Sequence, residues 1–335
     1  MNDIVQIPLD PISPMIKQKA RLHCATLPDE EKAAMIARCH EMNETAKRHT
    51  GHASHIRLRV PKHVLAVPLS ARQRRTVDEL ATGETADICV AAQAEIAQIP
   101  IRESREPLVN LCTYASRSGV VMTFSDAPYP DVSGPSFAGK PQLFWARQSF
   151  AERLTLMAHI LAPLGIVLHV EEAFRPYEVQ AGMFRRRLAR TRSEHPSWTD
   201  EQVIAEARSK TASTPRLASH MAGAAADVFL RDAISGELLD FGHTYPDGGA
   251  VVHPASPFVT SEQWRHRQTL EVAAQLAGLA VYVGEDWHVS YGDNLWAWHT
   301  GAKAAIYGAV KAFSLKTGTI TSEFVGGELD YALST

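Results

Sequence analysis

The chain carries no excess of basic residues and no long apolar run. Its 34 lysines and arginines are outnumbered by 37 acidic residues, which gives a formal net charge of -3. It therefore lacks the basic surface that is typical of nucleic-acid-binding proteins. The longest apolar stretch, Met157 to Val170, is interrupted by His159, Pro163 and His169, whereas a membrane span needs ~18 apolar residues. We expect neither nucleic acid nor a membrane as a partner.

Cysteine is scarce, and no pair of cysteines has C-x-x-C spacing. The four are Cys24, Cys39, Cys89 and Cys112. The first residues, MNDIVQIPLDPIS, contain an early acid and two prolines and no basic region before an apolar core, unlike a secretory signal. We therefore expect no disulfide framework and a cytoplasmic location.

The composition that is present suits a folded globular protein. Of the 335 residues, 45% are hydrophobic and 21% are charged, and a chain of this length suits two average domains or one domain with an extension. The sequence of the first third predicts helices over 28–49 and about 70–98. Within 55–67 the residues alternate well enough for a strand until Pro61. Residues 126–141 are rich in proline, glycine and serine, so we expect a loop and a domain boundary there.

Helices and strands follow each other less regularly after this loop. The pattern predicts helices over 146–161, 177–189, 199–210 and 261–278, and strands over 165–170, 222–230, 237–241 and 281–289. Helices first and strands later favour an α+β fold over a doubly wound parallel sheet.

The segment from His220 to Asp227 contains two metal-ligand residue types seven positions apart. On one α-helix they would lie about 10 Å apart along the axis, too far to share an ion. On a regular strand they would face opposite sides of the sheet. A hairpin or bulge near Gly223 would bring them together, because glycine tolerates such backbone. A buried structural histidine near a surface aspartate is the alternative interpretation.

A second polar cluster ends the apolar pattern over 281–289. Glu285, Asp286 and His288 stand close together there. A third metal ligand at His288, with Glu285 reaching a metal-bound water, would make a zinc hydrolase site, because catalytic zinc keeps three protein ligands and one open position. The alternative is a strand end with solvated acids and a buried Trp-His pair.

Arg175 is predicted at a strand-to-helix junction, followed by Pro176. Helix N-terminal amides next to a guanidinium are suited to an oxyanion or a substrate carboxylate. The following helix also carries several arginines, for which we expect a solvated helical face rather than a bound acidic ligand: Arg185, Arg186, Arg187, Arg190 and Arg192. Further along the chain, His243, Asp247 and His253 are candidates to line the pocket.

Taken together, these segments resemble the D-alanyl-D-alanine dipeptidase family, the zinc dipeptidases associated with vancomycin resistance and related cell-wall peptidases. The family pattern S-x-H-x-x-G-x-A-x-D is met by His220, Gly223, Ala225 and Asp227, and its E-x-W-H pattern by Glu285, Trp287 and His288. The Tyr-Arg-Pro pattern corresponds to Phe174, Arg175 and Pro176. The segments 136–140 and 236–242 also resemble family segments, and the agreement extends over about 126–307.

The resemblance implies a role for each matching residue. His220, Asp227 and His288 would bind one zinc ion, Glu285 would be the general base and acid, and Arg175 would stabilise the oxyanion. The residues implied in substrate binding are Glu172, Phe174, Ser219 and Trp287. The substrate would be a dipeptide or small amide similar to D-alanyl-D-alanine.

Two positions depart from the family pattern. The family serine two residues before the first histidine is Ala218 here, while Ser219 directly precedes His220. Phe174 replaces a tyrosine and lacks its hydroxyl. The ligand set is therefore better matched than the substrate contacts, and the substrate could equally be a cell-wall dipeptide, an ordinary dipeptide or another amide.

The predicted domain organisation follows from the extent of the resemblance. Residues 1–120 would form a mainly helical N-terminal extension, which could act as a lid, an oligomerisation surface or a substrate-narrowing domain. Residues 121–335 would form the catalytic domain, an α+β fold in which a small, mostly antiparallel sheet flanked by helices carries the zinc site.

Two other functions remain open at this point. Two histidines and a carboxylate are also the ligand set of non-haem Fe(II) oxygenases, which could act on an amino-acid-like substrate. Their first two ligands usually lie closer in sequence than His220 and Asp227, and they do not require Glu285. The displaced serine and the long extension motivate the other alternative, a non-catalytic binding protein on the same fold.

Overall fold

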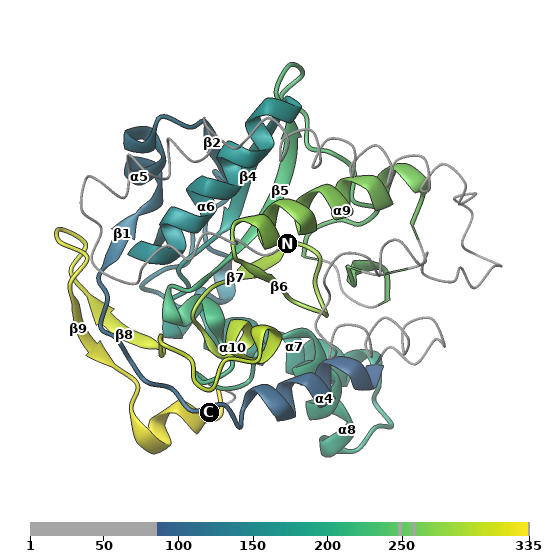
Figure 1. The fold of residues 1–335 in the computed structure, drawn as a ribbon. Helices are drawn as coiled ribbons and strands as arrows, with labels where there is room; N and C mark the ends of the chain where they lie inside the picture. The colour runs from purple at the N-terminus through teal and green to yellow at the C-terminus, as the bar shows by residue number, and fades with distance from the viewer. Residues whose placement is uncertain (1–85, 247–249, 255, 257–258, 334–335) are drawn as a thin grey trace.

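A five-stranded mixed sheet forms the centre of the computed structural model, which describes residues 86–246, 250–254, 256 and 259–333 (Figure 1). Its strand order is β2-β4-β5-β7-β6. Only β2 and β4 pair in parallel, and the other neighbours are antiparallel. The strands are β2 (Met122–Phe124), β4 (Ile166–Glu172), β5 (Ala225–Asp232), β6 (Ala280–Val281) and β7 (His288–Ser290).

Two further strand pairs flank this sheet, and helices surround it. The strand pairs are β1 (Leu108–Asn110) with β3 (Trp145–Arg147), and β8 (Val310–Phe313) with β9 (Ile320–Glu323). The α-helices are α4 (Ala86–Ile96), α5 (Leu111–Ser118), α6 (Gln148–Leu161), α7 (Tyr177–Glu194), α8 (Asp200–Lys210), α9 (Ser261–Leu276) and α10 (Asn294–Thr300). Short 3-10 turns are η2 (Asp131–Ser133), η3 (Ala162–Leu164), η4 (Ser219–Ala222), η5 (Ala250–Val252) and η6 (Gly326–Asp330).

The α+β fold class and the mostly antiparallel sheet are confirmed. The predicted helices over 146–161, 177–189, 199–210 and 261–278 appear as α6, α7, α8 and α9 with small shifts of their ends. Helices α8 and α9 each begin with a capping box, Thr199 with Gln202 and Thr260 with Gln263. In this motif each side chain satisfies a backbone N–H of the first turn.

Two strand predictions were wrong. Residues 281–289 do not form one strand, because the backbone turns back on itself between β6 and β7, which then pair antiparallel with each other. The amide of Glu285 bonds to the carbonyl of Tyr282 within this turn. Residues 237–241 form only an isolated bridge from Leu238 to Arg231. Leu238 is 46% exposed, so little apolar burial favours a longer strand there.

The core lies mainly between the sheet and the helix pair α6 and α9. Helix α6 contributes Phe150, Leu154 and Met157, all fully buried, and these pack in one cluster with Leu168 of β4 and Leu230 of β5. Figure 1 shows α6 and α9 lying over the sheet, with α4, α7 and α8 grouped at one end of it. Residues of α7 and α8 line one cavity together with Asp227 of β5 and His288 of β7.

Part of the predicted N-terminal extension belongs to this body. Strand β1 pairs with β3, α5 packs on α6, and α4 packs on α8. The predictions for 28–49, 55–67 and the first part of 70–98 lie outside the described residues. Among the residues that are described, none of the helices combines the length and the apolar character that crossing a bilayer requires.

His299 in α10 gives the folded protein a dependence on pH. Burial lowers its pKa from 6.5 to about 4, and its Nδ1 has no hydrogen-bond partner among the described residues. The unfolded chain therefore binds this proton more readily than the folded chain does. The contribution of His299 to the free energy of unfolding is fully present above about pH 6.5 and is lost as the pH falls toward about 4.

We expect this effect to be visible in urea denaturation of the metal-free protein. Between about pH 7.5 and about pH 5, the free energy of unfolding of the wild type should fall by about 2 kcal/mol more than that of His299→Gln. An identical pH dependence of the two proteins would contradict the assignment.

Candidate metal centre

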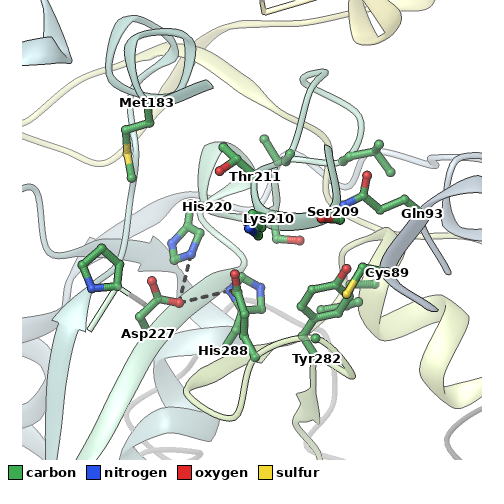
Figure 2. Close-up of a pocket in the computed structure, with 18 of the residues that line it drawn as sticks. Cys89, Gln93, Met183, Ser209, Lys210, Thr211, His220, Asp227, Tyr282 and His288 are labelled. Atoms are coloured by element: carbon green, nitrogen blue, oxygen red, sulfur yellow. Dashed lines mark hydrogen bonds and ion pairs between the residues drawn. The ribbon is translucent and has the colours of Figure 1, made fainter. Parts of the chain in front are cut away.

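Three buried side chains converge at the end of the sheet. Ligand atoms of His220, Asp227 and His288 all lie within 4.8 Å of one another. In Figure 2, dashed lines join one oxygen of the Asp227 carboxylate to both imidazoles. Its Oδ1 lies 3.2 Å from His220 Nε2 and 3.1 Å from His288 Nδ1. Two imidazole nitrogens and a carboxylate oxygen in this arrangement fit a three-ligand metal site with an open position.

The sheet register brings two of these ligands together. Asp227 of β5 is the direct cross-strand partner of His288 on β7, and on its other side it faces Glu172 of β4. Directly opposed residues of antiparallel strands project from the same face. Glu172, Asp227 and His288 therefore form one row across three strands.

The third ligand reaches the row through a tight turn before β5. His220 lies in η4, and Gly223 ends this turn with φ 65°, a left-handed conformation that glycine adopts without strain. A Cβ at this position would lie 2.3 Å from Cδ2 of Leu108. The expected change of direction at Gly223 is thus a 3-10 turn that places His220 over the strand, rather than a hairpin or a bulge.

Hydrogen bonds fix the orientation of the His220 ring. Its Nδ1 donates a hydrogen bond to the carbonyl oxygen of Ala173 at 2.7 Å, which directs Nε2 toward Asp227. A carbonyl behind a ligating imidazole commonly sets the tautomer in this way. Burial raises the pKa of Asp227, but the two imidazoles outweigh it and hold the pKa well below its ordinary value. The Asp227 carboxylate is therefore ionised, as a carboxylate that binds a metal ion must be.

The η4 turn is anchored from behind by a buried guanidinium. Arg147 is fully buried and its Nε donates to the carbonyl of Ala222, while its backbone amide donates to the carbonyl of Gly223. The same side chain pairs with Glu103 at 3.0 Å. Glu103, which precedes the loop at 126–141, thus helps through Arg147 to hold the turn that carries His220.

Glu285 lies beside the cluster, on the turn between β6 and β7. One of its oxygens is 3.8 Å from His288 Nδ1. Burial raises the pKa of this carboxyl to about 7, against the opposing effect of His288. The next residue, Asp286, accepts hydrogen bonds from His243 and pairs with Arg267 of α9 at 2.9 Å. These contacts tie the turn to the helix layer.

Arg175 is held rigidly at the edge of the cluster. Its Nε and Nη2 donate to the two carboxylate oxygens of Glu172 at 2.7 and 2.6 Å, and its Nη1 donates to Gln180 at 2.8 Å. Its Nη2 is 3.9 Å from Asp227 Oδ2. Burial lowers the pKa of the guanidinium, but Glu172 outweighs this and holds it above its ordinary value. Arg175 therefore supplies a fixed positive charge.

A cavity of about 270 Å³ opens in front of these residues. Ser219 and Trp287, two of the predicted substrate contacts, line it, as does His253. Glu172 and Phe174 are not among its lining residues, and their role in substrate binding stays a prediction. Glu172 instead binds Arg175, and the Phe174 ring packs against Phe313 at 5.0 Å.

The structure adds residues that the sequence did not indicate. The Tyr245 hydroxyl lies 2.8 Å from Asp227 Oδ2 and 3.2 Å from Glu172 Oε2. Cys89, Gln93 and Ile96 of α4 form part of the cavity wall. A single tyrosine in a loop and a helix far upstream carry no motif, so only the three-dimensional structure reveals them. His243 bonds to Asp286 instead of lining the cavity, and Asp247 lies outside the described residues.

Fold and site together define a candidate metalloenzyme, and the comparisons with known proteins give its family. The D-ala-D-ala dipeptidase family matches residues 134–304, just over half of the chain. A D-alanyl-D-alanine dipeptidase from Synechocystis sp. is 28% identical over 246 residues, which cover 64% of this chain and 95% of the relative. The chain therefore belongs to the D-ala-D-ala dipeptidase family and is a metallopeptidase, which confirms the resemblance seen in the sequence.

Proposed function

We propose that this metallopeptidase is a zinc-dependent dipeptidase that hydrolyses D-alanyl-D-alanine or a similarly small amide. The observation that carries the proposal is the convergence of His220, Asp227 and His288, with Glu285 beside His288. The 28% identical relative is described as a D-alanyl-D-alanine dipeptidase, which supports the substrate class. The cytoplasmic location and the role of the extension over 1–120 stay predictions from the sequence.

The mechanism assigns one task to each side chain. His220, Asp227 and His288 would hold zinc, which would supply a water of lowered pKa and a Lewis acid for the scissile carbonyl. Glu285 accepts the proton of the attacking water and delivers it to the leaving amine. Arg175, fixed by Glu172 and Gln180, offers positive charge to the developing oxyanion, and its fixed orientation avoids reorganisation during the reaction.

The alternatives are less well supported. A non-haem iron oxygenase would use the same two imidazoles and carboxylate, but it gives no role to Glu285 and does not agree with membership of a peptidase family. A purely binding protein would need neither the glutamate nor the metal ligands.

Metal analysis combined with dipeptide turnover tests the proposal. We expect the purified protein to bind a single zinc ion per chain and to release D-alanine from D-alanyl-D-alanine. A chelator should abolish the reaction and added zinc should restore it. Oxygen consumption with Fe(II) and an amino-acid substrate, or dipeptide hydrolysis by the fully metal-free protein, would contradict it.

Tyr245 is expected to hold Asp227 in its ligating orientation. In Tyr245→Phe the Asp227 Oδ2 loses its hydrogen-bond donor, and loss of such an outer contact typically weakens metal binding by about tenfold or more. Competition for zinc with a chromogenic chelator measures this. Tyr331→Phe, at a residue that is 56% exposed, is the matched control. Equal zinc affinity in the two variants would show that Tyr245 does not contribute to metal binding.

A further inference from the structure

The cavity wall contains one positive charge that no described residue neutralises. Its described cationic side chains are Arg175, Arg187 and Lys210. Arg175 is bound to Glu172, and Lys210 pairs with Glu206 at 2.5 Å. Arg187 has neither a hydrogen bond nor an ion pair with any residue that the structure describes.

Arg187 lies on the face of α7 that forms the cavity wall. Gln180, Met183 and Arg187 all line the cavity, and their spacing of three and four residues places them on one side of a helix. Gln180 holds Arg175 beside the metal centre, and Arg187 follows about 10 Å further along the helix axis. In Figure 2, Met183 extends from its helix toward His220 and Asp227.

Arg187 differs in this respect from the other arginines of α7. Arg185, Arg186, Arg190 and Arg192 are exposed, as the sequence predicts for a solvated face. Arg190 bonds to Glu194 and Arg192 to Asp200. Only Arg187 is half-buried and turned to the cavity.

The surroundings of Arg187 favour an anionic ligand. Burial and the neighbouring Arg190 lower the pKa of its guanidinium, whereas Glu206 and Glu285 raise it. Glu206 already has Lys210 as its partner. A half-buried cation that forms no ion pair within the described part of the chain gains most from a ligand that supplies the opposite charge. A guanidinium fork matches a carboxylate in two parallel hydrogen bonds.

We propose that Arg187 binds a carboxylate of the substrate, so that the cavity selects peptides that carry a free carboxylate within reach of α7. The proposal adds a substrate-binding residue to the proposed dipeptidase function. It rests on that function only in assuming that this cavity binds the substrate. The carboxylate could belong to the C-terminus of the peptide or to an acidic side chain. Both present the same group to the guanidinium.

Ligand binding to a zinc-loaded Glu285→Gln protein tests the proposal, because that protein should retain bound peptides without cleaving them. Three ligands are compared by calorimetry: D-alanyl-D-alanine, its C-terminal amide, and the amide of D-alanyl-D-glutamate. Arg187→Gln, Arg187→Lys and the exposed control Arg186→Gln are each added to this background. A charged hydrogen bond of this kind corresponds to about a ten- to hundredfold change in affinity.

We expect Arg187→Gln to weaken the binding of at least one ligand that carries a carboxylate by that factor. Binding of the D-alanyl-D-alanine amide, which has no carboxylate, should not change, and Arg187→Lys should restore part of the lost affinity. Weaker binding of D-alanyl-D-alanine would show that Arg187 binds the terminal carboxylate. Weaker binding of the D-alanyl-D-glutamate amide would show that it binds the side-chain carboxylate. Equal effects on ligands with and without a carboxylate, no effect, or no binding would overturn the proposal. Because the readout is binding, failure of the wild type to hydrolyse any dipeptide would count against the dipeptidase function alone.

Discussion

Glu285→Gln is expected to lower kcat for D-alanyl-D-alanine by about a hundred- to ten-thousandfold while leaving zinc bound. Glutamine preserves the shape of the side chain on the turn between β6 and β7 but cannot accept the proton of water. Glu285 is not one of the three convergent ligands, so metal content should not change. Steady-state kinetics and metal analysis of the same preparation measure the two effects.

The control for this substitution is Glu262→Gln. Glu262 lies in the first turn of α9 and its side chain is 70% exposed, so the same chemical change there should leave kcat unaltered. If Glu285→Gln kept kcat near that of the wild type, Glu285 would not be the general base. If it lost zinc together with activity, Glu285 would instead contribute to metal binding.

His220→Ala is expected to remove zinc and, with it, activity. Two protein ligands cannot retain the ion as three do, and the metal supplies several kcal/mol of transition-state stabilisation, which corresponds to about a thousandfold or more in rate. The Ala173 carbonyl, which faces His220 Nδ1 at 2.7 Å, would also lose its partner. Metal content after dialysis and the initial rate at high protein concentration measure the outcome.

His195→Ala controls for the general effect of losing an imidazole. His195 stacks on Trp198 at 3.7 Å and is not among the cavity residues. Circular dichroism separates loss of metal from loss of fold. A folded His220→Ala protein with zinc at wild-type stoichiometry would exclude His220 as a ligand.

The sequence was most informative where chemistry and spacing coincide. His220, Asp227 and His288 were predicted to meet, and they do. Their roles as zinc ligands and that of Glu285 as the base stay predictions. Each motif is local, so the order of residue types identifies it in the sequence. The family pattern then indicates that the separate motifs meet at one site.

The contacts that depend on tertiary structure were not accessible from the sequence. The apolar run over 281–289 is equally compatible with a strand and with a hairpin, and only pairing with β5 selects the hairpin register in which His288 faces Asp227. Tyr245 and Arg187 belong to no motif. Arg187 is indistinguishable in sequence from four neighbouring arginines, and the packing of α7 against α8 decides which of them faces inward.

Helix α4 helps to shape the cavity but contributes none of the three convergent residues of the candidate metal centre. It contributes Cys89, Gln93 and Ile96 to the wall, yet it lies before the range 134–304 that the family shares and supplies none of the convergent ligands. Substitutions in this helix can therefore widen or narrow the cavity for different peptides without changing the residues proposed to carry out hydrolysis. Substitutions at Gln93 and Ile96 are accordingly the natural starting point for redirecting the enzyme to new amides.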